Sequence, residues 1–122
     1  MNIENLNNKQ QEAVLKTEGP LLVLAGAGSC KTKVLTTRIA YLIEEKHIDP
    51  YNILAITFTN KAAKEMKDRT YNLIGEQASS LQISTFHSFG LKIVRENCEL
   101  LGYDHNFVIM DSDDSLTVVK KI

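Results

Sequence analysis

The residues best suited to chemistry lie in one short stretch, where a lysine and a threonine follow a loop of small residues. Residues 25–32 read AGAGSCKT. Such a loop lets backbone N–H groups surround a phosphate, and the helix that follows points its positive end at the same place. Lys31 can reach the β- and γ-phosphates of a nucleotide, and Thr32 can give its hydroxyl to Mg²⁺. The stretch predicts a site for ATP and Mg²⁺ in which Lys31 and Thr32 are the catalytic residues, together with the loop residues Ala25, Gly26, Ala27, Gly28, Ser29 and Cys30.

The loop departs from the expected pattern G-x-x-x-x-G-K-[ST] at two positions. Ala25 stands at the first glycine and Cys30 at the second. The residue before the lysine needs a backbone that glycine adopts cheaply, and a residue with a Cβ pays roughly 1–3 kcal/mol at a strained position of this kind. We therefore expect Cys30 to weaken nucleotide binding without erasing the fold. The alternative is an ordinary strand-to-helix turn rich in small residues.

Strands and helices alternate along the chain, which predicts an α/β fold with a parallel sheet and helices on both faces. Apolar strands are expected at residues 21–24, 52–57, 81–85 and 107–110. Helices are expected at residues 7–16, 31–46, 61–74, 86–101 and from 111 onward. The spacing predicts which side chains of three helices face inward. They are Leu35, Ile39, Leu42 and Ile43 in residues 31–46, Ala63, Met66, Thr70 and Leu73 in residues 61–74, and Phe86, Phe89, Ile93 and Leu100 in residues 86–101.

Ligands of a parallel sheet bind at the carboxyl ends of its strands, and three polar turns are expected along that edge. One is the phosphate loop. The others hold Phe58, Thr59 and Asn60, and Thr85, Phe86 and His87. Aromatic rings there can stack on unpaired bases, while hydroxyls, amides and helix N-termini hold phosphates. The alternative is that Phe58 and Phe86 are core residues and that the hydroxyls cap helices. Lys61, Lys64, Lys67 and Arg69 form either a nucleic-acid-binding edge or a solvated helix face.

Gln10 has two interpretations. It falls three residues after Asn7, so it can complete a capping box at the start of the first helix. Its amide can also read a base edge near the phosphate loop.

Composition sets limits on the function. The 122 residues suffice for one modest domain, and the net charge of −1 gives no overall attraction to nucleic acid. No apolar run is long enough to cross a bilayer, so no membrane partner is expected. Two cysteines far apart in sequence suit free thiols in a reducing cytoplasm, and the three separated histidines form no metal cluster.

Four ordered motifs make the chain resemble the N-terminal part of the PcrA/UvrD/Rep family of superfamily 1A DNA helicases. The matching stretches are residues 6–14 (LNNKQQEAV, the Q motif), 25–32 (motif I), 56–63 (ITFTNKAA, motif Ia, with Glu65 and Met66) and 84–88 (STFHS, motif Ib). The resemblance implies that residues 1–122 are the N-terminal part of the first RecA-like P-loop NTPase domain. It also implies an ATP-dependent 3′–5′ helicase or translocase of DNA repair or replication in the bacterial cytoplasm.

The same resemblance implies roles for single residues. Gln10 would recognise adenine, and Lys33 would contact the nucleotide where the family usually has arginine. Phe58 would stack on a base of single-stranded DNA, with Thr59, Asn60, Thr85 and His87 near its backbone. The partners implied are single-stranded DNA, duplex junctions and the other motor domains of the full-length chain.

The family's Walker B acid, catalytic glutamate, arginine fingers and second motor domain are expected beyond residue 122. Residues 107–111 (FVIMD) look like a Walker B strand, but Ser112 stands where the glutamate would be. The isolated chain should therefore not hydrolyse ATP at a useful rate. Two other functions stay open: a P-loop kinase or ATPase acting on a small molecule, and a nucleotide-binding piece that does not hydrolyse.

Overall fold

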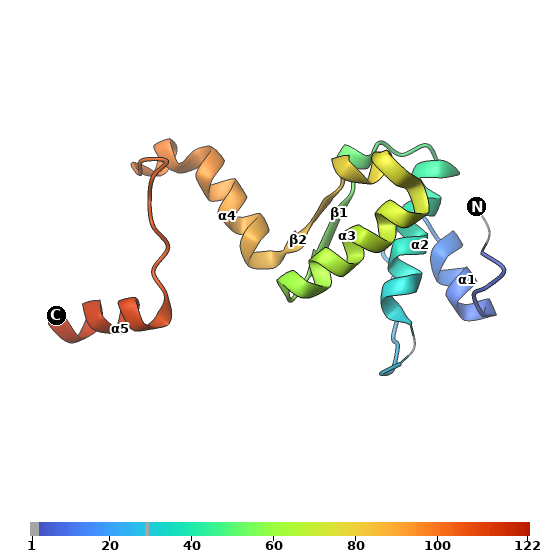
Figure 1. Ribbon diagram of the computed structural model, residues 1–122, viewed down its shortest axis with the longest axis horizontal. Coiled ribbons are helices and arrows are strands. Elements are labelled where there is room, and N and C mark those ends of the chain that lie inside the picture. Colours follow the sequence, from blue (N-terminus) through green and yellow to red (C-terminus); the bar gives the residue numbers. More distant parts are fainter. Residues whose placement is uncertain (1–2, 29) are drawn as a thin grey trace. The chain divides into compact units, whose positions relative to one another are not determined.

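The computed structural model describes residues 3–28 and 30–122. The chain divides into two compact units, Met1–Phe86 and His87–Ile122, and each is described by itself. The first unit contains α1 (Asn8–Leu15), α2 (Lys31–Glu44), β1 (Leu54–Thr57), α3 (Asn60–Ile74) and β2 (Gln82–Thr85), with short 3-10 helices η1 (Pro50–Asn52) and η2 (Gly75–Ser80) (Figure 1). Helix α4 (Phe86–Asn97) leads into the second unit, which continues with η3 (Cys98–Leu101) and α5 (Ser112–Lys121).

Three helices begin directly after residues whose side chains cap them. Asn7 caps α1 with the full capping box: its Oδ1 accepts from the Gln10 N–H (2.9 Å), and Gln10 Oε1 accepts from the Asn7 N–H (3.0 Å). Thr59 caps α3 and Asp111 caps α5, each with a side-chain oxygen that accepts the backbone N–H three residues later. Gly102 follows η3 in the left-handed conformation that glycine favours (φ 79°). These signals need no distant partner, so the sequence shows them directly.

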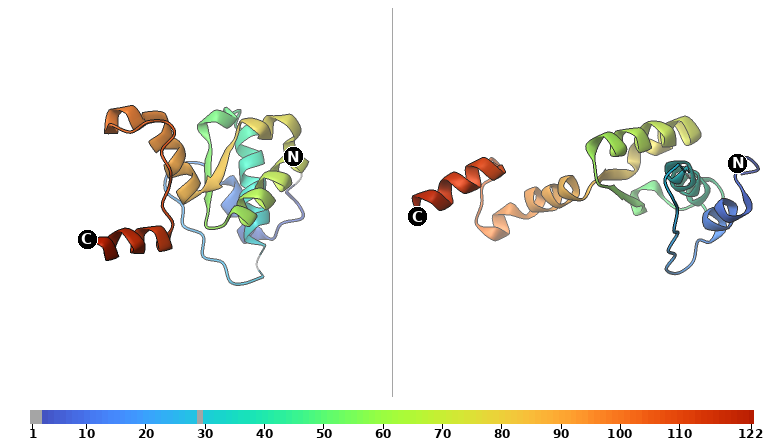
Figure 2. Two further views of the ribbon diagram at one scale, coloured as in Figure 1. Left: turned by 60° about the vertical axis from the view of Figure 1, so that its left-hand side comes forward. Right: turned by 90° about the horizontal axis from the view of Figure 1, so that it is seen from below.

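The sheet of the first unit consists of two parallel strands. β1 pairs with β2 in the register Leu54↔Gln82, Ala55↔Ile83, Ile56↔Ser84 and Thr57↔Thr85. Helix α3 connects the two strands and packs on one face of the pair, next to α2 (Figures 1 and 2). The opposite face carries Leu54 and Ile56, which are 46% and 41% exposed. Within the described first unit, the α/β class and the parallel pairing of the strands are confirmed, and helices on both faces of the sheet stay a prediction.

Helix α2 lies at the centre of the first unit because it contributes to both apolar clusters. Ile39, Ala40 and Ile43 join a core with side chains of α3 and β2. Val34 joins a second cluster with Leu6, Ala13 and Val14 around α1. The guanidinium of Arg38 donates to the carbonyls of Ala13 and Lys16, which ties α2 to the end of α1.

Two residues predicted to face inward on α2 and α3 are exposed in the structure. Leu35 and Leu73 are 46% and 48% exposed, whereas Val34 and Ile74 are buried. A helix with neighbours on two sides buries a wider arc than one apolar stripe indicates.

Two predicted strands, residues 21–24 and 107–110, are absent from the described sheet. Leu22 and Leu24 are 83% and 88% exposed, and Val108 is 85% exposed. A strand exists only when its backbone groups pair with a neighbour, and the two described strands pair with each other alone. Hence the phosphate loop is not placed at the edge of this sheet by strand pairing, contrary to the expected three-turn edge.

The second unit has a small interior around Cys98, which is fully buried. The Tyr103 N–H donates to the Cys98 carbonyl (2.9 Å), and Cys98 Sγ lies 3.3 Å from His105 Nδ1. Arg95 stacks over the Phe107 ring at 4.9 Å. Ile93 and Leu100, expected to face inward, are 45% and 86% exposed.

Candidate functional site

Two residues of the loop before α2 have a positive φ, the backbone conformation that glycine adopts most easily. Cys30 lies in the left-handed region (φ 53°, ψ 39°), and Gly28 also has a positive φ (77°). Helix α2 begins at Lys31, immediately after Cys30, as the sequence predicts. The expectation of a glycine-like conformation before the lysine is therefore confirmed. Ser29, also predicted to bind the nucleotide, lies outside the described residues.

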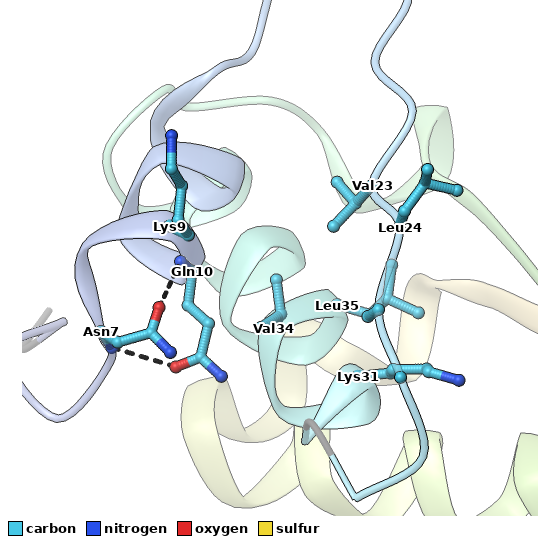
Figure 3. A pocket seen from close by; sticks show the side chains of 10 residues that line it. Asn7, Lys9, Gln10, Val23, Leu24, Lys31, Val34 and Leu35 are labelled. Carbon is cyan, nitrogen blue, oxygen red and sulfur yellow. Dashed lines mark hydrogen bonds between the residues drawn. The ribbon is translucent and has the colours of Figure 1, made fainter.

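A cavity of about 580 Å³ brings the predicted base-reading residue and the predicted catalytic lysine to one place. Helix α1, the chain before the loop and the start of α2 enclose it (Figure 3). Figure 3 shows Gln10 at the side of α1, while Lys31 extends from the start of α2 away from α1. The lining residues are Asn7, Lys9, Gln10, Val23, Leu24, Ala25, Gly26, Lys31, Val34 and Leu35.

The prediction that Gln10 completes the capping box is confirmed, because its Oε1 accepts the Asn7 N–H. The cap uses the amide oxygen.

A second cavity, of about 370 Å³, lies at the loop itself and is lined by Gly28, Cys30, Lys31, Thr32 and Arg69. Lys31 thus borders both cavities, and Thr32 borders only this one. Arg69 belongs to α3, which is distant from the loop in the sequence. The sequence grouped Arg69 with the lysines of its helix, and nothing in its spacing distinguished it from them.

The structure does not bring Lys33 into either of these cavities. Its Nζ donates to the Asn5 carbonyl (3.4 Å), and it lines a third cavity of about 370 Å³ with Asn5, Arg69 and Asn72 among others. Ala27 is exposed in the turn before Gly28 and is not among the residues lining the first two cavities.

The two aromatic turns lie at one edge of the sheet. Thr57 and Thr85 are partners at the carboxyl ends of β1 and β2, so the residues that follow them start from neighbouring points. Phe58 is fully exposed (102%) and Phe86 is 70% exposed. The interpretation of these rings as core residues is therefore wrong.

The polar residues of these turns differ in their surroundings. Thr59 Oγ1 accepts the Ala62 N–H (3.1 Å) as the cap of α3, and Asn60 is exposed at the first position of that helix. Thr85 is buried (7% exposed). His87 is exposed and belongs to the second unit.

Among the residues that the structure describes, no group of three or more histidine, cysteine, aspartate or glutamate side chains could hold a metal ion. In the same described ranges, no helix has the length and apolar content needed to cross a membrane.

Sequence comparison identifies the class of protein. Residues 6–122 match the family described as the UvrD/REP helicase N-terminal domain, and the chain belongs to this family. It is 56% identical over 120 residues to the ATP-dependent DNA helicase PcrA of Staphylococcus epidermidis (strain RP62A), and 53% identical to that of Staphylococcus aureus (strain Mu50). Each alignment covers 98% of this chain and 16% of the relative, so the chain spans about one sixth of the length of these relatives.

Proposed function

We propose that the chain is the nucleotide-binding N-terminal piece of an ATP-dependent DNA helicase. The full-length protein would couple ATP hydrolysis to 3′–5′ movement on single-stranded DNA, in repair or replication in the bacterial cytoplasm. The piece would form part of the first RecA-like motor domain, with other motor domains of the same chain as partners. The observation that carries the proposal is the left-handed residue directly before Lys31 at the start of α2. Membership of the UvrD/REP helicase family supports it.

The residues present fit ATP and Mg²⁺. The cavity at the loop carries two cationic side chains, one hydroxyl and the N-terminus of a 14-residue helix, a set that suits phosphate and its cation. Lys31 would hold the β- and γ-phosphates, Thr32 would be the Mg²⁺ ligand, and Gln10 would meet the base. When bound, Mg²⁺-ATP supplies the phosphoryl group whose transfer to water releases free energy.

Hydrolysis by the isolated chain is not expected. ATP hydrolysis by P-loop NTPases needs an acidic side chain that holds Mg²⁺ and a further residue that positions the attacking water. None of the described residues lining the cavity at the loop carries a carboxylate. The isolated chain would therefore bind nucleotide without turning it over.

Single-stranded DNA would bind across the ends of β1 and β2. A phenylalanine that is fully exposed gains free energy when a base covers its ring, by roughly 1–3 kcal/mol per base. Phe58 and Phe86 would stack on bases, and Thr59, Asn60, Thr85 and His87 would lie near the backbone, including at duplex junctions. A kinase for small molecules has no use for such exposed rings, so this observation favours the helicase.

Binding of a fluorescent oligo-dT strand tests the DNA-binding part of the proposal. Phe58→Ala should weaken binding about tenfold, in line with the loss of one stacked base, worth roughly 1–3 kcal/mol. The matched control is Tyr51→Ala, which removes another exposed ring (73%) at η1, before the start of β1. Equal affinities of the two variants would contradict the proposed DNA site.

A further inference from the structure

Arg69 is a cation that the sequence motifs leave without a role and that the structure brings to the phosphate loop. It lines the cavity formed by Gly28, Cys30, Lys31 and Thr32, although it lies on α3. It also lines the neighbouring cavity with Lys33. Among the residues described as lining the cavity at the loop, Arg69 is the one that does not come from residues 28–32.

The guanidinium of Arg69 is held by an exchangeable partner. Its Nη2 lies 2.6 Å from Glu65 Oε1, one helical turn earlier on α3, and both side chains are about half exposed (49% and 48%). Ion pairs of this kind on a helix surface are weak, because water solvates both partners. A nucleotide phosphate carries more charge than a carboxylate and accepts two parallel hydrogen bonds from a guanidinium. Phosphate can therefore displace Glu65.

We infer that Arg69 is a phosphate-binding residue of the nucleotide site, and that Glu65 competes with the nucleotide for it. The inference rests on the proposed function, since it assigns one more contact to the same site. In the free chain, Glu65 neutralises Arg69. When a nucleotide occupies the loop cavity, the guanidinium turns from the carboxylate to a phosphate. Lys31 and Arg69 then hold the phosphates from two different helices.

The other cations near the loop do not fit this role equally well. Lys33 donates to the Asn5 carbonyl and lines a cavity to which none of the described residues of the loop contributes. Lys67, two residues before Arg69 on α3, lines a separate cavity with Tyr71 and Leu81. Lys67 therefore offers a matched control, with the same helix and the same loss of charge when replaced by glutamine.

The experiment is a calorimetric titration of Mg²⁺-ATP, and separately of inorganic tripolyphosphate, into the 122-residue chain and its variants. Arg69→Gln should lower the affinity for both ligands about five- to tenfold, whereas Lys67→Gln should change these affinities less than twofold. Glu65→Gln should tighten both about two- to threefold, because the competing carboxylate is gone. Weakening of tripolyphosphate shows that the contact is to phosphate, and weakening of Mg²⁺-ATP alone would overturn that assignment.

Failure of this inference is distinguishable from failure of the proposed function. If Lys31→Ala abolishes binding while Arg69→Gln behaves like Lys67→Gln, the nucleotide site stands and the role of Arg69 is refuted. If the parent chain binds neither ligand, both are refuted. Circular dichroism checks the fold of each variant. Should Arg69→Gln fail to fold, Glu65→Gln decides: tighter binding supports the inference, and unchanged binding overturns it.

Discussion

Replacing Cys30 by glycine should stabilise the chain, because Cys30 is held in a conformation that costs free energy. Its φ of 53° and ψ of 39° lie in the left-handed region, which costs a residue with a Cβ about 1–2 kcal/mol. Glycine avoids that cost but loses about 0.5–1 kcal/mol more conformational entropy on folding. The expected net gain in the free energy of unfolding is about 0.5–1 kcal/mol, which corresponds to an increase in Tm of about 2–8 °C for a unit of this size.

Thermal and urea unfolding followed by circular dichroism measure this gain. Cys30→Ala is the matched control, because it removes the thiol but keeps the Cβ, and its stability should stay within about 0.5 kcal/mol of the parent. Glycine at position 30 should also raise the affinity for Mg²⁺-ATP, since the cysteine side chain stands where the backbone must approach phosphate. The expected increase is about two- to fivefold, the factor that about 0.5–1 kcal/mol produces.

A second control separates strain from nucleotide binding. His47 is the other described non-glycine residue with a positive φ (55°), and it is not among the residues lining the cavities at the loop. His47→Gly should therefore raise the stability without changing the affinity for Mg²⁺-ATP. The strain argument is refuted if Cys30→Gly is no more stable than Cys30→Ala.

Two further predictions concern α1 and α3. Gln10→Ala removes the acceptor of the Asn7 N–H and should lower the free energy of unfolding by about 0.5–1.5 kcal/mol; a urea midpoint equal to that of the parent would show that the capping box is not formed in solution. Tyr71 donates to Glu76 Oε1 (2.7 Å), and this hydrogen bond, together with the charge of Glu76, raises the pKa of Tyr71 above its ordinary value of 10.0. Folding therefore favours the neutral phenol of Tyr71. The contribution of this hydrogen bond to the free energy of unfolding is complete below pH 10 and is lost as the pH rises through the folded-state pKa. Glu76→Gln should bring the ultraviolet titration of Tyr71 back toward its ordinary value, and an unchanged titration would exclude the contact.

The sequence predicts best what depends on neighbouring residues alone. The capping box of Asn7 and Gln10, the end of η3 at Gly102 and the special backbone of Cys30 all follow from local steric and hydrogen-bonding rules. The resemblance to helicases, carried by four short motifs, agrees with the family match over residues 6–122.

Features that depend on distant partners were predicted less well. Residues 21–24 have the composition of a buried strand, but among the described residues no strand pairs with them, and Leu24 stays 88% exposed. The burial of Val34 in place of Leu35 follows from packing against α1 as well as α3. Arg69 reaches the phosphate loop only through the packing of α2 against α3. None of these contacts leaves a signal in sequence spacing.

The most direct test of the account is calorimetric titration of Mg²⁺-ATP into the chain and into Lys31→Ala, with Lys64→Ala as a control for the loss of an exposed lysine elsewhere in the first unit. Loss of a charge-assisted contact worth roughly 1.5–3 kcal/mol predicts that Lys31→Ala binds at least tenfold more weakly than the parent, while Lys64→Ala binds alike. Equal affinities of the two variants would contradict the assignment of the 25–32 loop as the phosphate site.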